Sequence, residues 1–406
     1  MPSIIAPAVL AVSLFVIFFR PHFSAIQPWK AMAVGAIAVL LLGAISPIGA
    51  LHSIDWGVML FLYGMFVLAS GLEHSGYLHH LGVKLVNQFT SPFGLLVAFV
   101  FGAGLASALL LNDTVAIVGA PLSIAIAKRS KIRAAPLLLG LALAVTVGSI
   151  LSPIGNPQNY IIASQPGFSA PFLNFFKYLA VPTMLSLFAL LVLLWFLFPS
   201  LRKLKKFELD GPRRGDYHAA RRAFQSIIVL SLFRIASSFL LLPEFPLYWI
   251  AIAGALVYLI LSCNLSGALQ ADWETMLFFA GMFILMGAVW DSGFFQQFMP
   301  EQAKLSDPSV IMIASIFFSQ VFSNVPFVVL YLKALGPATA KSLVLLAAGS
   351  TLAGGITIFG AASNIIILQS AEKRGETLPV KEFMLVGAAT VLISSLLILG
   401  WIAFIG

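Results

Sequence analysis

The sequence predicts an all-α polytopic membrane protein with two inverted repeats, each made of five transmembrane crossings, a re-entrant hairpin and a broken helix. Three observations support this fold class. Hydrophobic residues make up 60% of the 406 residues and charged residues only 9%, whereas soluble domains carry roughly a quarter charged residues. Apolar runs near the ~20 residues that cross a bilayer recur along the chain. In addition, one segment of the first half recurs in the second half.

The recurring segment is residues 54–81, which match residues 271–298 in register. An Asp-Trp pair, a Gly-Met-Phe run and a Ser-Gly pair stand at the same places in both copies. Chance similarity between apolar segments would share Leu, Val and Phe, not Trp, Gly and Asp at matching positions. The chain is therefore interpreted as a duplication, which in membrane proteins is typical of transporters whose binding site lies between the repeats.

We expect the first repeat at residues 1–199, a basic linker at 200–222 and the second repeat at 223–406. Each repeat contains four uninterrupted apolar spans. They are expected at residues 4–19, 32–45, 56–70 and 172–198 in the first repeat and at 223–242, 247–261, 273–289 and 383–404 in the second.

Two irregular segments lie between the third and fourth of these spans. The first, at 93–127 and 310–335, has two apolar arms that meet at polar residues. The arm at 114–127 is too short to cross a bilayer at ~1.5 Å per residue, so we expect a re-entrant hairpin. The second, at 135–164 and 342–369, is interrupted by Pro, Gly and Asn. These residues stop a helix, so we expect a broken helix that crosses the membrane.

The distribution of basic residues sets the predicted orientation. The linker is rich in Lys and Arg, which favours the cytoplasmic side. An odd number of crossings in each repeat then places both termini outside and most of the 23 Lys and Arg residues inside. The predicted location is the cell inner (plasma) membrane. The net charge of +8 thus reflects topology and lipid contact, and no nucleic-acid partner is expected.

The hairpin tips and helix breaks carry the candidate substrate site. Their backbone polar groups lie unpaired at membrane depth, which is tolerated where they line a cavity or bind a solute. A single Asn in a membrane helix more often links helices, but four at corresponding repeat positions, each beside a helix breaker, favour a site. The predicted substrate-binding residues are Asn112, Thr114, Gly155, Asn156, Asn159, Ser323, Asn324, Gly360, Ser363 and Asn364.

Asp113 is the candidate proton-coupling residue. An ionisable side chain within the membrane is costly and is by default a functional candidate. Its counterpart in the second hairpin is Val325, so repeat symmetry does not explain it. The alternative role is to cap the half-helix that begins at Thr114, and the two roles are compatible.

Other polar residues leave alternatives open. Arg234 lies within an apolar span and could pair with an acidic residue, reach an anionic substrate or extend to the membrane surface. The single cysteine, Cys263, allows no internal disulfide and no thiol pair for a metal. We expect no cofactor beyond a proton or sodium as coupling ion. The sequence also lacks a metalloprotease motif, a phosphate-binding loop and a nucleophile elbow, so no enzyme is predicted.

The hairpin-tip and broken-helix motifs resemble the ion transporter superfamily of arsenite permeases, sodium/proton antiporters, citrate permeases and divalent anion/sodium symporters. The symporters carry Ser-Asn-Thr at both tips, whereas the tips here read Asn112-Asp113-Thr114 and Ser323-Asn324-Val325. The Asn-Asp pair is more similar to ArsB-type arsenite permeases and plant silicon efflux transporters. The resemblance covers nearly the whole chain and implies a homodimer, in which hairpins and broken helices form an elevator-type transport domain.

The leading functional prediction is a proton-coupled secondary transporter that exports a small metalloid hydroxide or oxyanion of the arsenite or antimonite type by alternating access. A carboxylate at Asp113 would repel a dianion in a poorly solvated cavity but not a neutral hydroxide. The alternatives are sodium- or proton-coupled transport of citrate, a dicarboxylate or an inorganic anion, sodium/proton antiport, and a passive channel.

Overall fold

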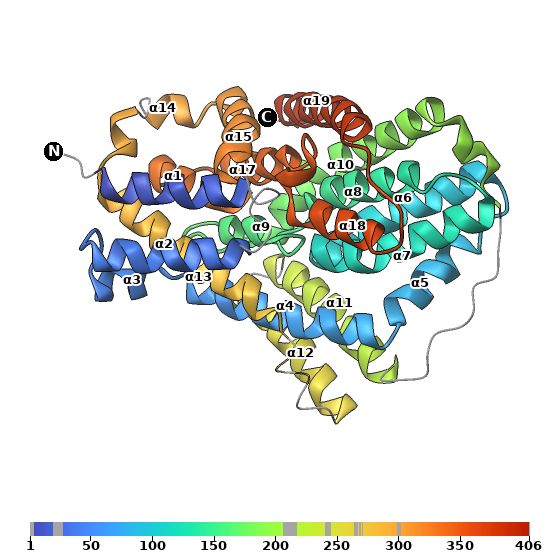
Figure 1. Cartoon of the computed structure of the whole chain (residues 1–406), viewed down its shortest axis with the longest axis horizontal. Helices are drawn as coiled ribbons and strands as arrows, with labels where there is room; N and C mark the ends of the chain where they lie inside the picture. Colours follow the sequence, from blue (N-terminus) through green and yellow to red (C-terminus); the bar gives the residue numbers. More distant parts are fainter. Residues whose placement is uncertain are drawn as a thin grey trace.

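The computed structural model describes residues 4–18, 27–205, 217–239, 245–263, 267, 269, 271–298 and 302–405, and these are helical with short connections and no strand (Figure 1). The first half contains α1 (Ile5–Phe18), α2 (Pro28–Leu41), α3 (Pro47–Ser53), α4 (Trp56–His74), α5 (Tyr77–Val86), α6 (Pro92–Leu109), α7 (Asn112–Ser130), α8 (Ala135–Ser149), α9 (Pro157–Ala163) and α10 (Pro171–Leu197).

The second half contains η1 (Pro199–Lys203), α11 (Tyr217–Phe239), α12 (Tyr248–Ser262), α13 (Trp273–Asp291), η3 (Phe295–Phe298), α14 (Gln302–Leu305), α15 (Pro308–Phe322), α16 (Asn324–Leu335), α17 (Ala340–Ala353), η4 (Ile358–Gly360), α18 (Ala362–Glu372) and α19 (Val380–Ile405). The eight predicted spans coincide with α1, α2, α4, α10, α11, α12, α13 and α19. Much of the basic linker, at 206–216, lies outside the described residues.

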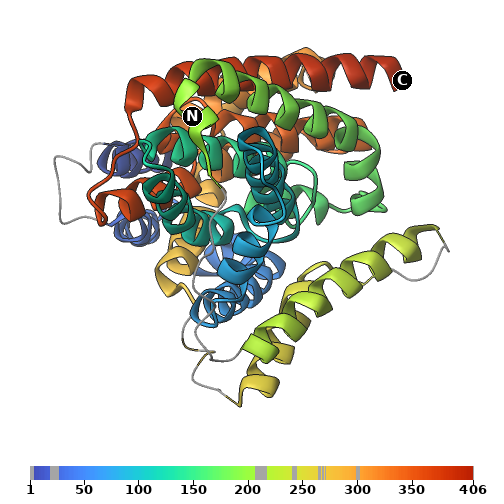
Figure 2. The ribbon, with the colours of Figure 1, turned by 90° about the vertical axis from the view of Figure 1, so that its right-hand side faces the viewer.

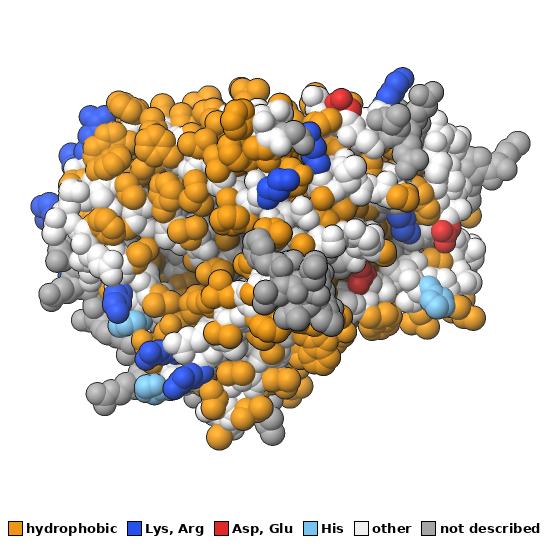
Figure 3. Space-filling model, turned by 180° about the vertical axis from the view of Figure 1, so that it is seen from behind, with side chains coloured by type: hydrophobic (Ala, Val, Ile, Leu, Met, Phe, Trp, Pro, Cys, Tyr) orange, Lys and Arg blue, Asp and Glu red, His pale blue; other side chains and the backbone are white. Residues whose placement is uncertain are grey.

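Five helices, α4, α6, α10, α13 and α19, are long and apolar enough to cross a membrane by themselves. Helices α1, α2, α8 and α12 are apolar but shorter. Helix α11 has 23 residues but begins with His218, Arg221 and Arg222, so its apolar part is shorter than its length. Large hydrophobic side chains such as Leu41, Leu385 and Phe404 are exposed, and hydrophobic atoms dominate the face in Figure 3. Such a surface is typical of contact with lipid.

The first hairpin differs from the expectation in the length of its arms. Helix α6 has 18 residues and α7 has 19, because α7 begins at Asn112 itself and continues through Lys128 and Arg129 before it ends at Ser130. The prediction of a short second arm at 114–127 is therefore wrong, and helix length alone does not argue for re-entrance. In the second hairpin α15 has 15 residues and α16 only 12.

Both predicted helix breaks are present. Helix α8 ends at Ser149 and α9 begins at Pro157, so seven residues separate the two helical pieces. In the second half α17 ends at Ala353 and α18 begins at Ala362, with the short η4 turn between them. Pro at the start of α9 and Gly in the second break account for both interruptions, since Pro lacks a backbone donor and Gly weakens a helix.

The two halves pack in matching ways. Helix α4 packs on α12 of the other half, and its counterpart α13 packs on α2. In the same manner, α7 packs on α18 and α16 packs on α9. Each half thus interlocks with the other, and each second hairpin arm meets the far piece of the other half's broken helix. Figure 2 shows α10 and α19 side by side along one edge, with α11 and α12 along the opposite side.

Two glycines at matching repeat positions allow the closest of these contacts. A Cβ atom on Gly64 of α4 would lie 2.6 Å from the backbone of Ala251, and one on Gly281 of α13 would lie 2.8 Å from the backbone of Met32. Backbone atoms cannot move aside as a flexible side chain can. The α4–α12 and α13–α2 contacts therefore both require glycine.

We expect Gly64→Ala and Gly281→Ala each to destabilise the fold by about 1–3 kcal/mol, because the added methyl group overpacks a backbone contact. The measurement is the unfolding midpoint of the purified protein in detergent. Gly400→Ala is the matched control, since a Cβ atom there meets nothing within 4 Å. Equal midpoints for all three variants would contradict the packing account.

Candidate functional site

The first helix break is closed by two asparagine side chains. The Oδ1 atom of Asn156 accepts a hydrogen bond from the backbone N–H of Asn159 at 2.8 Å and caps α9. The Nδ2 group of Asn159 donates to the carbonyl oxygens of Ser149 and Ser152 at 2.9 and 3.0 Å. Both asparagines are fully buried. The side chain of Asn159 therefore satisfies carbonyl groups that the end of α8 would leave unpaired.

The second break repeats this arrangement. The Nδ2 group of Asn364 donates to the carbonyl oxygens of Gly354 and Thr357 at 2.8 and 3.4 Å. The acceptors precede Asn364 by the same spacing as in the first repeat, ten and seven residues. In both arrangements the side-chain amide of one Asn donates to two backbone carbonyls at the break of its own broken helix. We call this arrangement the Asn bracket. Each repeat has one, around Asn159 and Asn364.

Thr351 joins the first bracket to the second repeat. This residue of α17 donates from Oγ1 to Oδ1 of Asn159 at 3.2 Å. Oγ1 of Thr351 also accepts hydrogen bonds from Nδ2 of Asn156 at 3.1 Å and from Nε2 of Gln158 at 3.4 Å. One hydroxyl of the second repeat thus contacts three amides of the first. The matching residue, Thr146, instead donates to the carbonyl of Ala142 at 2.8 Å within its own helix.

The tip of the first hairpin contacts both breaks. The backbone N–H of Asn112 donates to the carbonyl of Gly155 at 3.0 Å, and its Nδ2 donates to Oγ of Ser363 at 3.4 Å. Asp113 and Thr114 follow in the first turn of α7, and Asp113 donates its backbone N–H to Oδ1 of Asn112. Gly155 lies in the break between α8 and α9, so the first hairpin tip rests directly on the first break.

The second tip approaches the second break. Ser323 has a φ of +70° and ψ of 160°, a conformation that costs a non-glycine residue about 1–3 kcal/mol and tends to occur at functional sites. Asn324, which starts α16, is buried, and its Nδ2 lies near Gly354. Gln320 on α15 donates to the carbonyl of Ala353 at 2.7 Å. Gln320 thereby fixes the first arm of this hairpin against the end of α17.

The structure thus brings most of the predicted site residues into one buried region. Asn112, Thr114, Asn156, Asn159, Asn324, Ser363 and Asn364 are buried there, and Gly155 lies buried in the first break. Gly360, which ends the η4 turn, is half-buried, and Ser323, the first residue of the second tip, is exposed. Sequence reasoning did not identify Gln158, Gln320 or Thr351 as parts of this region. Gln320 and Thr351 are single polar residues in apolar segments, whereas Gln158 lies between Pro157 and Asn159 in the first break. All three make contacts that are distant in sequence, which is why the sequence gives little signal for them.

Three oxygens in this region are buried and have no hydrogen-bond partner within the described residues: Oδ1 of Asp113, of Asn324 and of Asn364. A buried polar atom without a partner is costly, so such atoms in folded proteins usually contact a ligand, an ion or water. All three are acceptors. The site therefore has unused capacity for a ligand that donates hydrogen bonds or carries positive charge.

The helix ends add a second electrostatic feature. Helices α7, α16 and α18 all begin at this region, and their first turns supply backbone N–H groups. The N-terminal ends of helices carry partial positive charge and favour anions. Asp113 places a carboxyl group in the first turn of α7 and offsets part of this potential. Among the described residues no group of three His, Cys, Asp or Glu is placed to hold a metal ion.

Residues 13–345 match a protein family described as citrate transporter (CitMHS). The chain belongs to this family. It is 31% identical to the inner membrane protein YbiR of Escherichia coli over 79% of this chain and 82% of that protein. It is 24% identical to the silicon efflux transporter LSI3 of Oryza sativa subsp. japonica, with 84% of each chain covered. The chain is therefore a membrane transporter, and the predicted superfamily is confirmed.

Among solved structures, the fold is similar to that of the Alcanivorax borkumensis YdaH transporter. The TM-score is 0.52 and the identity is 14%, with 87% of this chain and 86% of that chain covered. This likeness shows a common all-helical transporter fold. It confirms the polytopic α-helical class, and the orientation of the repeats in the membrane stays a prediction.

We expect Thr351→Val to lower the free energy of unfolding by about 1–3 kcal/mol, because the nearly isosteric change removes three hydrogen bonds between the repeats and deprives buried Oδ1 of Asn159 and Nε2 of Gln158 of the partner that Thr351 supplies. The matched control is Thr146→Val, which removes one hydrogen bond within α8. The measurement compares denaturant unfolding of the two variants in detergent. A loss for Thr146→Val as large as that for Thr351→Val would contradict the proposed link between the repeats.

Proposed function

We propose that this member of the citrate transporter family is a proton-coupled secondary transporter that exports a small metalloid hydroxide or oxyanion of the arsenite or antimonite type. The observation that supports this most strongly is the set of three unpartnered acceptor oxygens on Asp113, Asn324 and Asn364. A neutral hydroxide presents O–H donors to such oxygens. A fully ionised dianion presents only acceptors and would lie beside the carboxyl group of Asp113.

The direct substrate contacts are proposed for Asn112, Ser363, Asn324 and Asn364, from the two tips and the second break. Asn156 and Asn159 have a different proposed role, since the hydrogen bonds of their side chains hold the first break together. They position the first break, against which the tip at Asn112 rests. The side chain of Asn112 is also hydrogen-bonded, but to Ser363 and to the backbone of Asp113 at the tip itself. This division of roles refines the expectation that all five asparagines bind substrate.

Proton coupling is proposed for Asp113. Its Oδ1 atom is buried and lacks a partner within the described part of the chain, and burial of an ionised carboxylate costs far more than burial of a neutral carboxyl group. A protonated Asp113 can also donate a hydrogen bond to a substrate oxygen. Uptake and release of a proton at this residue would thus change both the charge and the hydrogen bonding of the site.

The proposed membrane arrangement is that of two inverted repeats with re-entrant hairpins, the linker 200–222 in the cytoplasm and both termini outside. The interlocked packing of α7 with α18 and of α16 with α9 supports the repeat relation. The contact between Asn112 and Gly155 supports a hairpin whose tip rests on the first break. The proposed elevator motion and homodimer rest on the resemblance to the superfamily alone.

Transport of citrate, a dicarboxylate or an inorganic anion, coupled to protons or sodium, is the second candidate. The family description favours it, and so do the N-terminal ends of α7, α16 and α18, which favour bound anions. The name of the rice relative favours the leading candidate, because it assigns efflux of silicon, which in neutral water exists mainly as a small uncharged hydroxide. Transport assays with purified protein in proteoliposomes distinguish these candidates.

The functional test is a pH jump across proteoliposomes that contain arsenite or antimonite, with citrate, succinate and sodium in parallel. We expect metalloid movement to follow the proton gradient. Asp113→Asn, which preserves shape but cannot ionise, should lose gradient-driven movement at least tenfold while exchange without a gradient persists. Full gradient-driven transport by the variant would exclude Asp113 as the coupling residue, and movement of citrate or succinate instead would favour the second candidate.

A pair of alanine variants tests the division of roles among the asparagines. We expect Asn324→Ala to raise KM about tenfold with little change in unfolding midpoint, because it removes a ligand contact worth roughly 1.4 kcal/mol. We expect Asn156→Ala to lower the unfolding midpoint, since it removes the cap of α9 and a bond to Thr351. Transport rates and thermal unfolding are measured on the same samples. A reversed pattern would contradict the assignment.

A further inference from the structure

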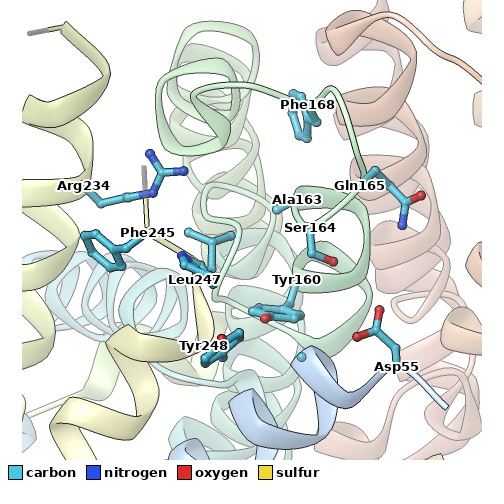
Figure 4. Close-up of a pocket in the computed structure, with 12 residues that line it drawn as sticks. Asp55, Tyr160, Ala163, Ser164, Gln165, Phe168, Arg234, Phe245, Leu247 and Tyr248 are labelled. Carbon is cyan, nitrogen blue, oxygen red and sulfur yellow. The ribbon is translucent and has the colours of Figure 1, made fainter. Parts of the chain in front are cut away.

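A second polar pocket lies apart from the hairpin tips. Its volume is about 430 Å³, and it is bounded by the start of α4, the end of α9, the middle of α11 and the start of α12 (Figure 4). In the predicted topology this is the extracellular side. The buried ring of Tyr160 on α9 forms one wall and stacks on Phe61 of α4 with ring centroids 4.2 Å apart. The same short helix carries Asn159 of the first bracket.

The pocket carries opposite charges at its two ends. Figure 4 shows Arg234 on one side and Asp55 on the other, with Leu247, Tyr160 and Tyr248 between them. Arg234 is only 4% exposed, and its guanidinium lies 5.8 Å from the ring centroid of Phe245. A guanidinium offers N–H donors in a planar fork that suits carboxylate and other oxyanions.

Asp55 provides the opposite charge. Its Oδ1 atom accepts the backbone N–H of Val58 at 3.0 Å and caps α4. A carboxylate has about four acceptor positions, so the cap leaves capacity for a cation. The matching residue of the second repeat, Asp272, caps α13 through Thr275 in the same way. Asp272 does not line this pocket. The cap thus explains why both repeats have Asp here, and the pocket gives Asp55 a second role.

We propose that this pocket binds a small zwitterionic organic molecule, with its anionic group on Arg234 and its cationic group on Asp55. The aromatic and aliphatic side chains between the two charges suit a short apolar spacer. A dianion would meet the carboxylate of Asp55, and a dication would meet the guanidinium of Arg234. Charge repulsion at one end therefore disfavours both of these ligand classes.

An occupant of this pocket would bridge two parts of the transporter. Tyr160 belongs to α9, which carries the first bracket, whereas Asp55, Arg234 and Tyr248 belong to α4, α11 and α12. Any movement of α9 relative to these helices would change the distance between the pocket walls. This inference does not depend on which solute passes the hairpin tips.

The test is calorimetric titration of the full-length protein in lipid nanodiscs with ω-amino acids from 3-aminopropanoate to 6-aminohexanoate. Succinate and glutarate, and the diamines putrescine and cadaverine, serve as probes of matched length. We expect at least one amino acid to bind about tenfold tighter than the diacid and diamine of similar length. Absence of binding by every amino acid, or equal affinity for the matched diacids or diamines, would overturn the proposal.

Asp55→Asn is the decisive variant, because Asn also caps helices well and should keep α4 intact. We expect it to weaken amino-acid binding about tenfold and to remove the preference over the diacid. Asp272→Asn is the matched control and should change neither. Asp113→Asn should also leave binding unchanged, which separates this pocket from the proposed transport site. An unchanged affinity in Asp55→Asn, or an equal loss in Asp272→Asn, would contradict the assignment.

Discussion

The structure depends on closing two interrupted helices at membrane depth. Lipid offers no hydrogen bonds, so the backbone groups freed by each break must find partners inside the protein. In both repeats one asparagine, Asn159 or Asn364, donates its amide to two carbonyls that lie ten and seven residues earlier, at the start of the break or within it. Both hairpins then pack against these closed breaks. Side chains of the protein thereby hold the irregular backbone of both breaks in place.

The two repeats close their helix breaks in the same way, but they differ in whether the side-chain oxygen of the bracket asparagine has a hydrogen-bond partner. In the first repeat the remaining acceptor of Asn159 is used by Thr351. In the second repeat Oδ1 of Asn364 has no partner in the described residues, and the same holds for Asn324 and Asp113 nearby. The free acceptor of the first bracket is thus used within the protein, whereas that of the second bracket is not. The two repeats share one backbone arrangement and differ at a few side chains, among them the unpartnered oxygens of Asp113 in the first half and of Asn324 and Asn364 in the second.

Most of this architecture could be predicted from the sequence, because apolar length and helix-breaking residues are local signals. The spans, both breaks and both hairpin tips fall where Pro, Gly and Asn interrupt apolar runs. The length of α7 was underestimated because Asn112 and Lys128 look like loop residues but are helical. The hydrogen bonds of Thr351 to the first repeat and the pocket between Asp55 and Arg234 could not be predicted, since both bring together residues that are distant in sequence. Nor does a sequence show whether the side-chain oxygen of a buried asparagine has a partner within the protein, which distinguishes Asn159 from Asn364.

The most direct test is to locate the bound solute. Crystals grown with antimonite allow the antimony atom to be found by anomalous diffraction, without assumptions about transport direction or coupling. The account predicts an anomalous peak enclosed by the side chains of Asn324, Asn364 and Asp113. A peak elsewhere, or no antimony peak at these residues while crystals grown with citrate show citrate bound there, would contradict the proposed substrate and its place between the two hairpin tips.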